Sequence, residues 1–115
     1  MRYFSLNHKV CITVPSTQGI ADKITAAEHK ARAGIVAGKL SDLFGGATSY
    51  KAGGYYRADD GRLIVETVYK VEAYTSDTDL EKNQQDLFTY ADQLRREYQQ
   101  ESLLLEIDGV AMFIE

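Results

Sequence analysis

Apolar and polar residues alternate along two segments of the chain, and this period of two predicts β-strands. The alternation is clearest over residues 62–75 and is also regular over residues 9–14. Shorter strands are predicted for residues 48–57, 102–107 and 110–114. Two turn signals, Ala58 to Gly61 and Asp108-Gly109, join neighbouring strands into hairpins. Gly53-Gly54 interrupts one strand and predicts a weak point or a bulge there.

Apolar residues at steps of three and four predict two helices. The first begins at Thr25-Ala26-Ala27-Glu28, which has the form of a capping box, and ends before Gly45-Gly46. The second covers residues 79–100 and begins at a similar box at Thr78. The order is therefore β-α-β-β-α-β with an extra C-terminal strand. This predicts a ferredoxin-like α+β fold, an antiparallel sheet with two helices on one face.

Length and composition indicate one ordinary globular domain spanning residues 1–115, with 44% hydrophobic and 26% charged residues. The net charge of −4 disfavours binding to nucleic acid, which depends on clustered Lys and Arg. The single cysteine forms no intrachain disulfide, which fits a reducing compartment. We see no signal sequence and no apolar run near the ~18 residues that cross a bilayer. We therefore expect a cytoplasmic protein that does not bind a membrane.

The sequence shows no catalytic constellation. A closed structural zinc site would have to recruit carboxylates, because the only His and Cys residues are His8, His29 and Cys11, so no metal and no cofactor is expected. A Cys11/His29 nucleophile pair is conceivable, but a cysteine in the middle of an apolar strand is typical of a buried, inert thiol. Glu66 and Glu72 flank Lys70 on the wetter face of the long strand, which predicts ordinary cross-strand salt pairs.

The eight tyrosines are the unusual feature. Five of them fall on the central hairpin, and tyrosine is favoured at interfaces because it combines an apolar body with a polar tip. The same strand order occurs in RNA-recognition domains, but the acidic residues on the wet face argue against that function. We predict a contact surface for a protein partner at Tyr50, Tyr55, Tyr56, Arg57 and Tyr74.

Three blocks of the chain, Asn7 to Thr17, Leu40 to Thr48 and Gln100 to Gly109, resemble small proteins of phages and other mobile elements of Gram-positive bacteria. The blocks mark the family and carry no known chemistry, so no functional residue transfers. The resemblance implies a mobile-element origin. Small, acidic, non-enzymatic proteins of such elements are often inhibitors of host defence, including anti-CRISPR proteins.

The first hypothesis is therefore a non-catalytic protein-binding module that inhibits a host defence nuclease complex, such as a CRISPR effector. The alternative is a small-ligand-binding or enzymatic dimeric α+β domain, with His29, Cys11 and Glu66 as reactive candidates. A closed apolar pocket that contains one of these groups would favour the alternative. A third hypothesis is assembly through strand pairing at the apolar edge of residues 110–114.

Overall fold

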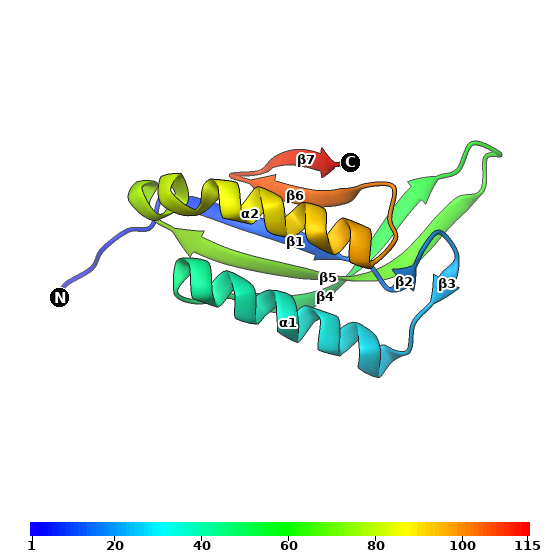
Figure 1. Ribbon diagram of the computed structural model, residues 1–115, viewed down its shortest axis with the longest axis horizontal. Helices are drawn as coiled ribbons and strands as arrows, with labels where there is room; N and C mark the ends of the chain where they lie inside the picture. The colour runs from blue at the N-terminus through cyan, green and yellow to red at the C-terminus, as the bar shows by residue number, and fades with distance from the viewer.

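The computed structural model describes residues 1–115 and contains a five-stranded antiparallel sheet in the order β4-β5-β1-β6-β7. Both helices cover one face of this sheet and leave the other face open (Figure 1). The predicted ferredoxin-like fold with an extra C-terminal strand is confirmed. The elements are β1 His8–Val14, β2 Thr17–Gln18, β3 Asp22–Lys23, α1 Ala26–Phe44, β4 Thr48–Arg57, β5 Leu63–Thr75, α2 Asp77–Glu97, β6 Leu103–Ile107 and β7 Val110–Ile114.

The ends of the helices follow local capping chemistry. Thr25 Oγ1 accepts a hydrogen bond from the Glu28 backbone N–H at 3.1 Å, as predicted, and Gly45 ends α1 with φ of 95°. The second helix begins two residues earlier than predicted, because Ser76 caps it by accepting from the Asp79 N–H at 3.1 Å. Asp77 then occupies the first turn, where the helix dipole favours a negative charge.

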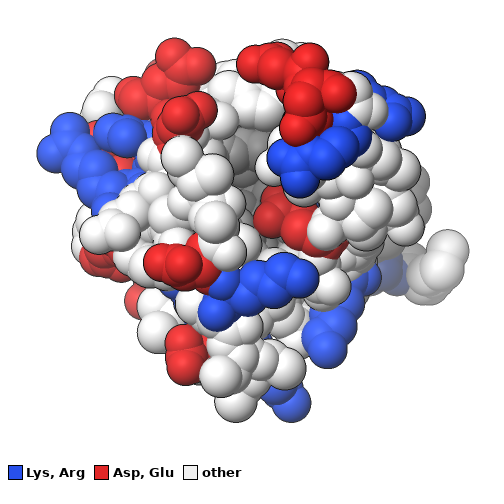
Figure 2. Space-filling view, turned by 90° about the vertical axis from the view of Figure 1, so that its right-hand side faces the viewer, with Lys and Arg blue, Asp and Glu red and all other residues white.

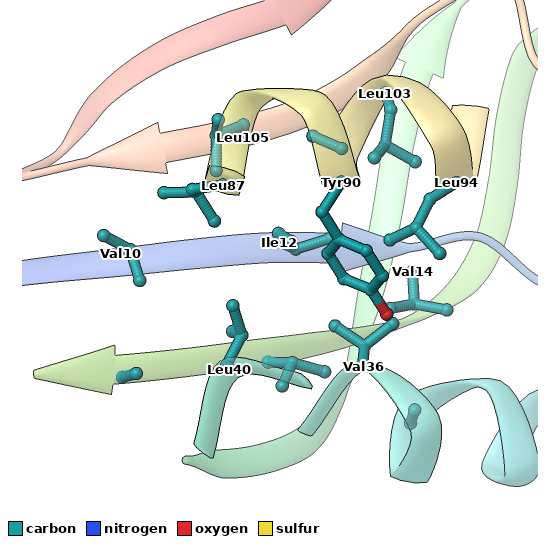
Figure 3. Packing of buried hydrophobic residues seen from close by; sticks show 14 of the residues in the cluster. Val10, Ile12, Val14, Val36, Leu40, Leu87, Tyr90, Leu94, Leu103 and Leu105 are labelled. Atoms are coloured by element: carbon teal, nitrogen blue, oxygen red, sulfur yellow. The ribbon is translucent and has the colours of Figure 1, made fainter. Parts of the chain in front are cut away.

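The core lies between the helices and the sheet (Figure 3). Val10, Ile12 and Val14 of β1 are fully buried at its centre, within a cluster of 18 buried residues. Burial of each such side chain contributes roughly 1.5–3 kcal/mol, so this apolar layer is a main source of the stability of the domain. In Figure 3 the Tyr90 ring extends from α2 toward α1, and its buried hydroxyl has no hydrogen-bond partner.

The β4–β5 hairpin extends beyond the helices as an arm (Figure 1). Tyr55 and Val65 lie on the helix-side face of this arm but remain 67% and 55% exposed, because no helix reaches them. The ladder is regular through Gly53 and Gly54, so the predicted bulge is wrong. The small β2–β3 hairpin lies in a segment expected to be a loop. Neither helix is long and apolar enough to cross a membrane.

Candidate functional site

Three hollows surround the middle of the β4–β5 hairpin. The helix hollow, of about 440 Å³, lies at the N-terminus of α1. The sheet hollow, of about 770 Å³, lies on the open face of the sheet, and the loop hollow, of about 320 Å³, lies beside Gly19 and Gln100. Glu66 lines all three. Figure 2 faces this end of the molecule and shows a hollowed surface with both acidic and basic side chains around it.

Glu66 has no ion-pair or hydrogen-bond partner, and the register of the sheet explains why. It lies opposite Gly54, and its neighbours on the same face of β5 are Ile64 and Val68. The strand β1 ends at Val14, which pairs with Tyr69, so no residue of β1 reaches Glu66. Burial raises the pKa of the Glu66 carboxyl group. A half-buried, unpaired carboxylate with a shifted pKa is typical of functional sites, and it can accept a cation.

Gly53 and Gly54 have no side chains and so leave space for the side chains of neighbouring residues. A Cβ atom added at Gly54 would lie 3.4 Å from Glu66 Cγ, and one added at Gly53 would lie 3.1 Å from the Tyr55 ring. The Tyr55 ring thus lies close over Gly53, and Tyr55 lines both the helix hollow and the sheet hollow. Tyr56 lies on the same face of the sheet as Glu66, diagonally across the ladder, and both line the sheet hollow, where an aromatic ring and a carboxylate together favour a cationic ligand. Glycine within a strand was the only sequence signal for the close approach of Tyr55 to Gly53.

His29 is the second reactive candidate that lines a hollow. Its side chain is 4% exposed, its Nε2 atom lies 3.0 Å from the carbonyl oxygen of Val14, and its ring packs edge-on against Tyr69. Because a carbonyl only accepts, Nε2 carries the proton in the neutral ring, and Nδ1 is left as an acceptor. Tyr69, one of the hairpin tyrosines, is a core residue that is 8% exposed.

Cys11 lies on the opposite face of the sheet from His29, so the nucleophile pair considered from the sequence is wrong. The thiol is 3% exposed, as expected for an inert cysteine, and lies on β1 between Glu72 and Glu106 of the adjacent strands. Burial, reinforced by Glu106, raises the pKa of the Cys11 thiol to about 11. The protonated thiol is a poor nucleophile.

Lys70 and Glu72 form cross-strand ion pairs, as predicted, but with other partners than each other, and Glu66 forms none. Glu66 lies four residues away along the strand, about 13 Å, which is beyond the reach of Lys70. Lys70 instead extends across β1, where its Nζ donates to Thr13 Oγ1 at 2.8 Å and to Glu106 Oε2 at 3.1 Å. Glu72 lies 3.8 Å from the ammonium group of Lys9.

The five residues of the predicted protein-contact surface do not form one patch. Tyr50, Tyr56 and Tyr74 lie on the open face of the sheet, whereas Tyr55 and Arg57 alternate to the other face. Tyr74 lies ten residues along β5 from the partner of Tyr56, about 33 Å away. Whether these residues bind a partner stays a prediction.

No group of three or more His, Cys, Asp or Glu side chains is placed to hold a metal ion. The hollows are open to solvent and lined by both polar and apolar residues, so they differ from the closed apolar pocket that we set as a criterion. Two of the three reactive candidates, His29 and Glu66, nevertheless line the helix hollow. The arrangement is thus a set of solvent-open hollows with one unpaired carboxylate that can attract a cation.

No protein-family model matches the chain, and no curated protein is significantly similar in sequence. Solved structures of a phage SAM lyase (SAM, S-adenosylmethionine) share its fold. The complex with S-methyl-5′-thioadenosine matches with a TM-score of 0.61 over 97% of this chain and 89% of that chain, at 21% identity. The apo state matches with a TM-score of 0.63 over 97% and 90%, at 20% identity.

These structures contradict the expectation of a non-catalytic anti-CRISPR module and the expectation that the chain is not an enzyme. The proteins that share its fold are an enzyme, in one case with a nucleoside bound. The alternative of a small-ligand-binding or enzymatic domain agrees better, although its dimeric state stays a prediction. The neighbours are phage proteins, which supports the phage part of the resemblance; nothing supports its Gram-positive or anti-defence part.

Proposed function

We propose that this chain is an enzyme that cleaves S-adenosylmethionine and releases S-methyl-5′-thioadenosine. The proposal is supported by the fold shared with phage SAM lyases over 97% of the chain. Because many functions share one fold, the site must also suit the substrate. We expect the reaction to take place in the cytosol of the host cell.

Glu66 is the observation that carries the proposal. SAM is a sulfonium cation attached to an adenosine and to an amino-acid chain, and a cation is what an unpaired carboxylate beside a tyrosine ring can attract. The sheet hollow, of about 770 Å³, offers the face of Tyr56 and the apolar surface of Leu104 for the nucleoside. The sheet hollow therefore provides a place for both the charged and the flat parts of the substrate.

In the proposed reaction, a carboxylate oxygen of the amino-acid chain of SAM attacks the carbon that is bonded to sulfur. The bond between that carbon and sulfur breaks, its electron pair goes to sulfur, and the amino-acid chain leaves as a lactone that keeps its ammonium group. The sulfonium becomes the neutral thioether of S-methyl-5′-thioadenosine, so a positive charge disappears at sulfur. Glu66 would hold the sulfonium end of SAM in the sheet hollow, and Tyr56 would close one side of it. Positioning of this kind lowers the entropic part of the barrier.

The test is to incubate the purified chain with SAM and to measure S-methyl-5′-thioadenosine by chromatography and mass spectrometry. We expect release by the wild-type chain and a loss of about tenfold or more in kcat/KM for Glu66→Gln, because the amide lacks the charge. Glu81→Gln is the matched control, because Glu81 is an exposed acid on α2 with no ion pair. An inactive wild-type chain, or equal activity of the two variants, would refute the proposal.

A further inference from the structure

The helix hollow presents side-chain charges of one sign only. Lys23 and Lys51 line it, and neither forms an ion pair with a carboxylate of the chain. Glu66 is the only acidic residue along its wall, and the alternation of β5 directs the Glu66 carboxylate to the open face of the sheet. The neighbouring acids Asp22 and Glu28 do not line the hollow. Two unpaired ammonium groups without a facing carboxylate favour an anion.

The Tyr69 ring brings Lys51 and His29 together on the helix side of the sheet. Lys51 Nζ lies 5.9 Å from the centre of this ring, and the His29 ring packs against it with a centroid distance of 4.6 Å. His29 is 4% exposed, its Nε2 donates to the Val14 carbonyl oxygen, and its Nδ1 has no partner. Tyr90 Oη is the only fully enclosed side-chain polar atom without a partner, so the Nδ1 atom retains an opening. His29 lines the helix hollow and neither of the other two, so its unused acceptor is available there.

The N-terminus of α1 adds hydrogen-bond donors to the same hollow. Thr25 and Ala26 line it, and the backbone N–H groups of Ala26 and Ala27 precede the first helical hydrogen bond and have no acceptor. Free N–H groups at the start of a 19-residue helix, together with the helix dipole, attract a phosphate. With the two lysines, these donors can bind several oxygen atoms of one anion.

We propose that the helix hollow binds a phosphate group, with its charged oxygens at Lys51, Lys23 and the α1 N-terminus and its P–OH group donating to His29 Nδ1. Phosphate and its monoesters carry an exchangeable proton near neutral pH, whereas sulfate carries none, so the unused acceptor selects phosphate. A hollow of about 440 Å³ falls in the roughly 300–1,000 Å³ range of small-ligand sites, so an ester with an organic group fits. The phosphate site lies on the opposite face of the sheet from the sheet hollow and does not rest on the proposed function.

Calorimetric titration at pH 7 with inorganic phosphate, ribose 5-phosphate and sulfate tests this assignment. We expect inorganic phosphate to bind the wild-type chain at least about fivefold more tightly than sulfate, as for one hydrogen bond. Lys51→Met should weaken phosphate binding about five- to tenfold, as for a lost charge-assisted contact that is partly exposed. Tighter binding of ribose 5-phosphate than of inorganic phosphate would assign the site to an ester, and equal affinity would assign it to the free ion.

Lys82→Met is the matched control, because Lys82 is an exposed lysine on α2 with no ion pair. Glu66→Gln should change phosphate binding less than about twofold, because the Glu66 side chain lies on the other face of the sheet. Equal affinity for phosphate and sulfate, or equal behaviour of Lys51→Met and Lys82→Met, would overturn the proposal.

A competition experiment separates this site from the proposed SAM site. Saturating S-methyl-5′-thioadenosine should leave the affinity for phosphate unchanged, because the two hollows lie on opposite faces of the sheet. Competition between the two ligands would place phosphate in the sheet hollow and overturn the proposal. Neither result depends on the cleavage of SAM, so the phosphate site and the proposed function fail separately.

Discussion

The salt bridge between Lys70 and Glu106 spans three strands and should stabilise the sheet measurably. Lys70 is 19% exposed and Glu106 is 29% exposed, and Lys70 also donates to Thr13. Lys70→Met removes two charge-assisted hydrogen bonds and leaves Glu106 unpaired. Partial exposure reduces the usual 1.5–3 kcal/mol for such contacts, so we expect a loss of about 2 kcal/mol in the free energy of unfolding.

Glu106→Gln should cost less, about 1 kcal/mol, because Lys70 keeps its bond to Thr13 and the amide oxygen still accepts. The double variant should lose only about 2 kcal/mol, since no charge is then left unpaired, which gives a coupling energy of roughly 1 kcal/mol.

Urea denaturation of the four proteins measures these values. A loss of about 2 kcal/mol lowers the midpoint by about 1 M at an m-value typical of this size. Lys9→Met is the control on the same face, because its ion pair with Glu72 is 3.8 Å long and Lys9 is 43% exposed. Such a pair contributes about 0.5 kcal/mol or less. Additive losses within about 0.5 kcal/mol would refute the coupling.

Two further predictions concern titratable groups. Cys11 should resist a thiol reagent at pH 8 in the folded chain and react fully in urea, because its thiol is buried and its pKa is raised to about 11; rapid labelling without urea would contradict this. The imidazole of His8 donates hydrogen bonds to Asp108 and Asp77, and these bonds raise the pKa of His8, whereas the bond from His8 lowers the pKa of Asp108. Stability from this contact should be full between the ordinary pKa values of 3.8 and 6.5, and should fall as acid protonates Asp108 or as rising pH deprotonates His8. Melting curves of the wild-type chain and His8→Ala from pH 3 to 9 should differ most inside that window, and a constant difference would refute the assignment.

The elements of the sheet could be predicted because long strands and helices repeat their burial pattern many times. The 13 residues of β5 and the apolar stripe of α1 gave clear periods. The two-residue strands β2 and β3 could not be found in this way, since two residues contain no period. The start of α2 was misplaced because Ser76 and Thr78 are both good capping residues, and packing of the helix on the sheet selects between them.

The candidate site was harder to predict from the sequence, because its main feature is that the Glu66 carboxylate has no ion-pair partner. Glu66 resembles any solvated acid on the wet face of a strand, and the nearby Lys70 suggests an ion pair. Only the structure shows that Gly54 lies opposite Glu66 and that Lys70 forms its ion pair with Glu106 of β6. An isolated charge beside a glycine is costly for the fold unless a ligand uses it, and natural proteins keep such costs mainly where function requires them. Glu66 therefore identifies the site more clearly than any tyrosine of the hairpin.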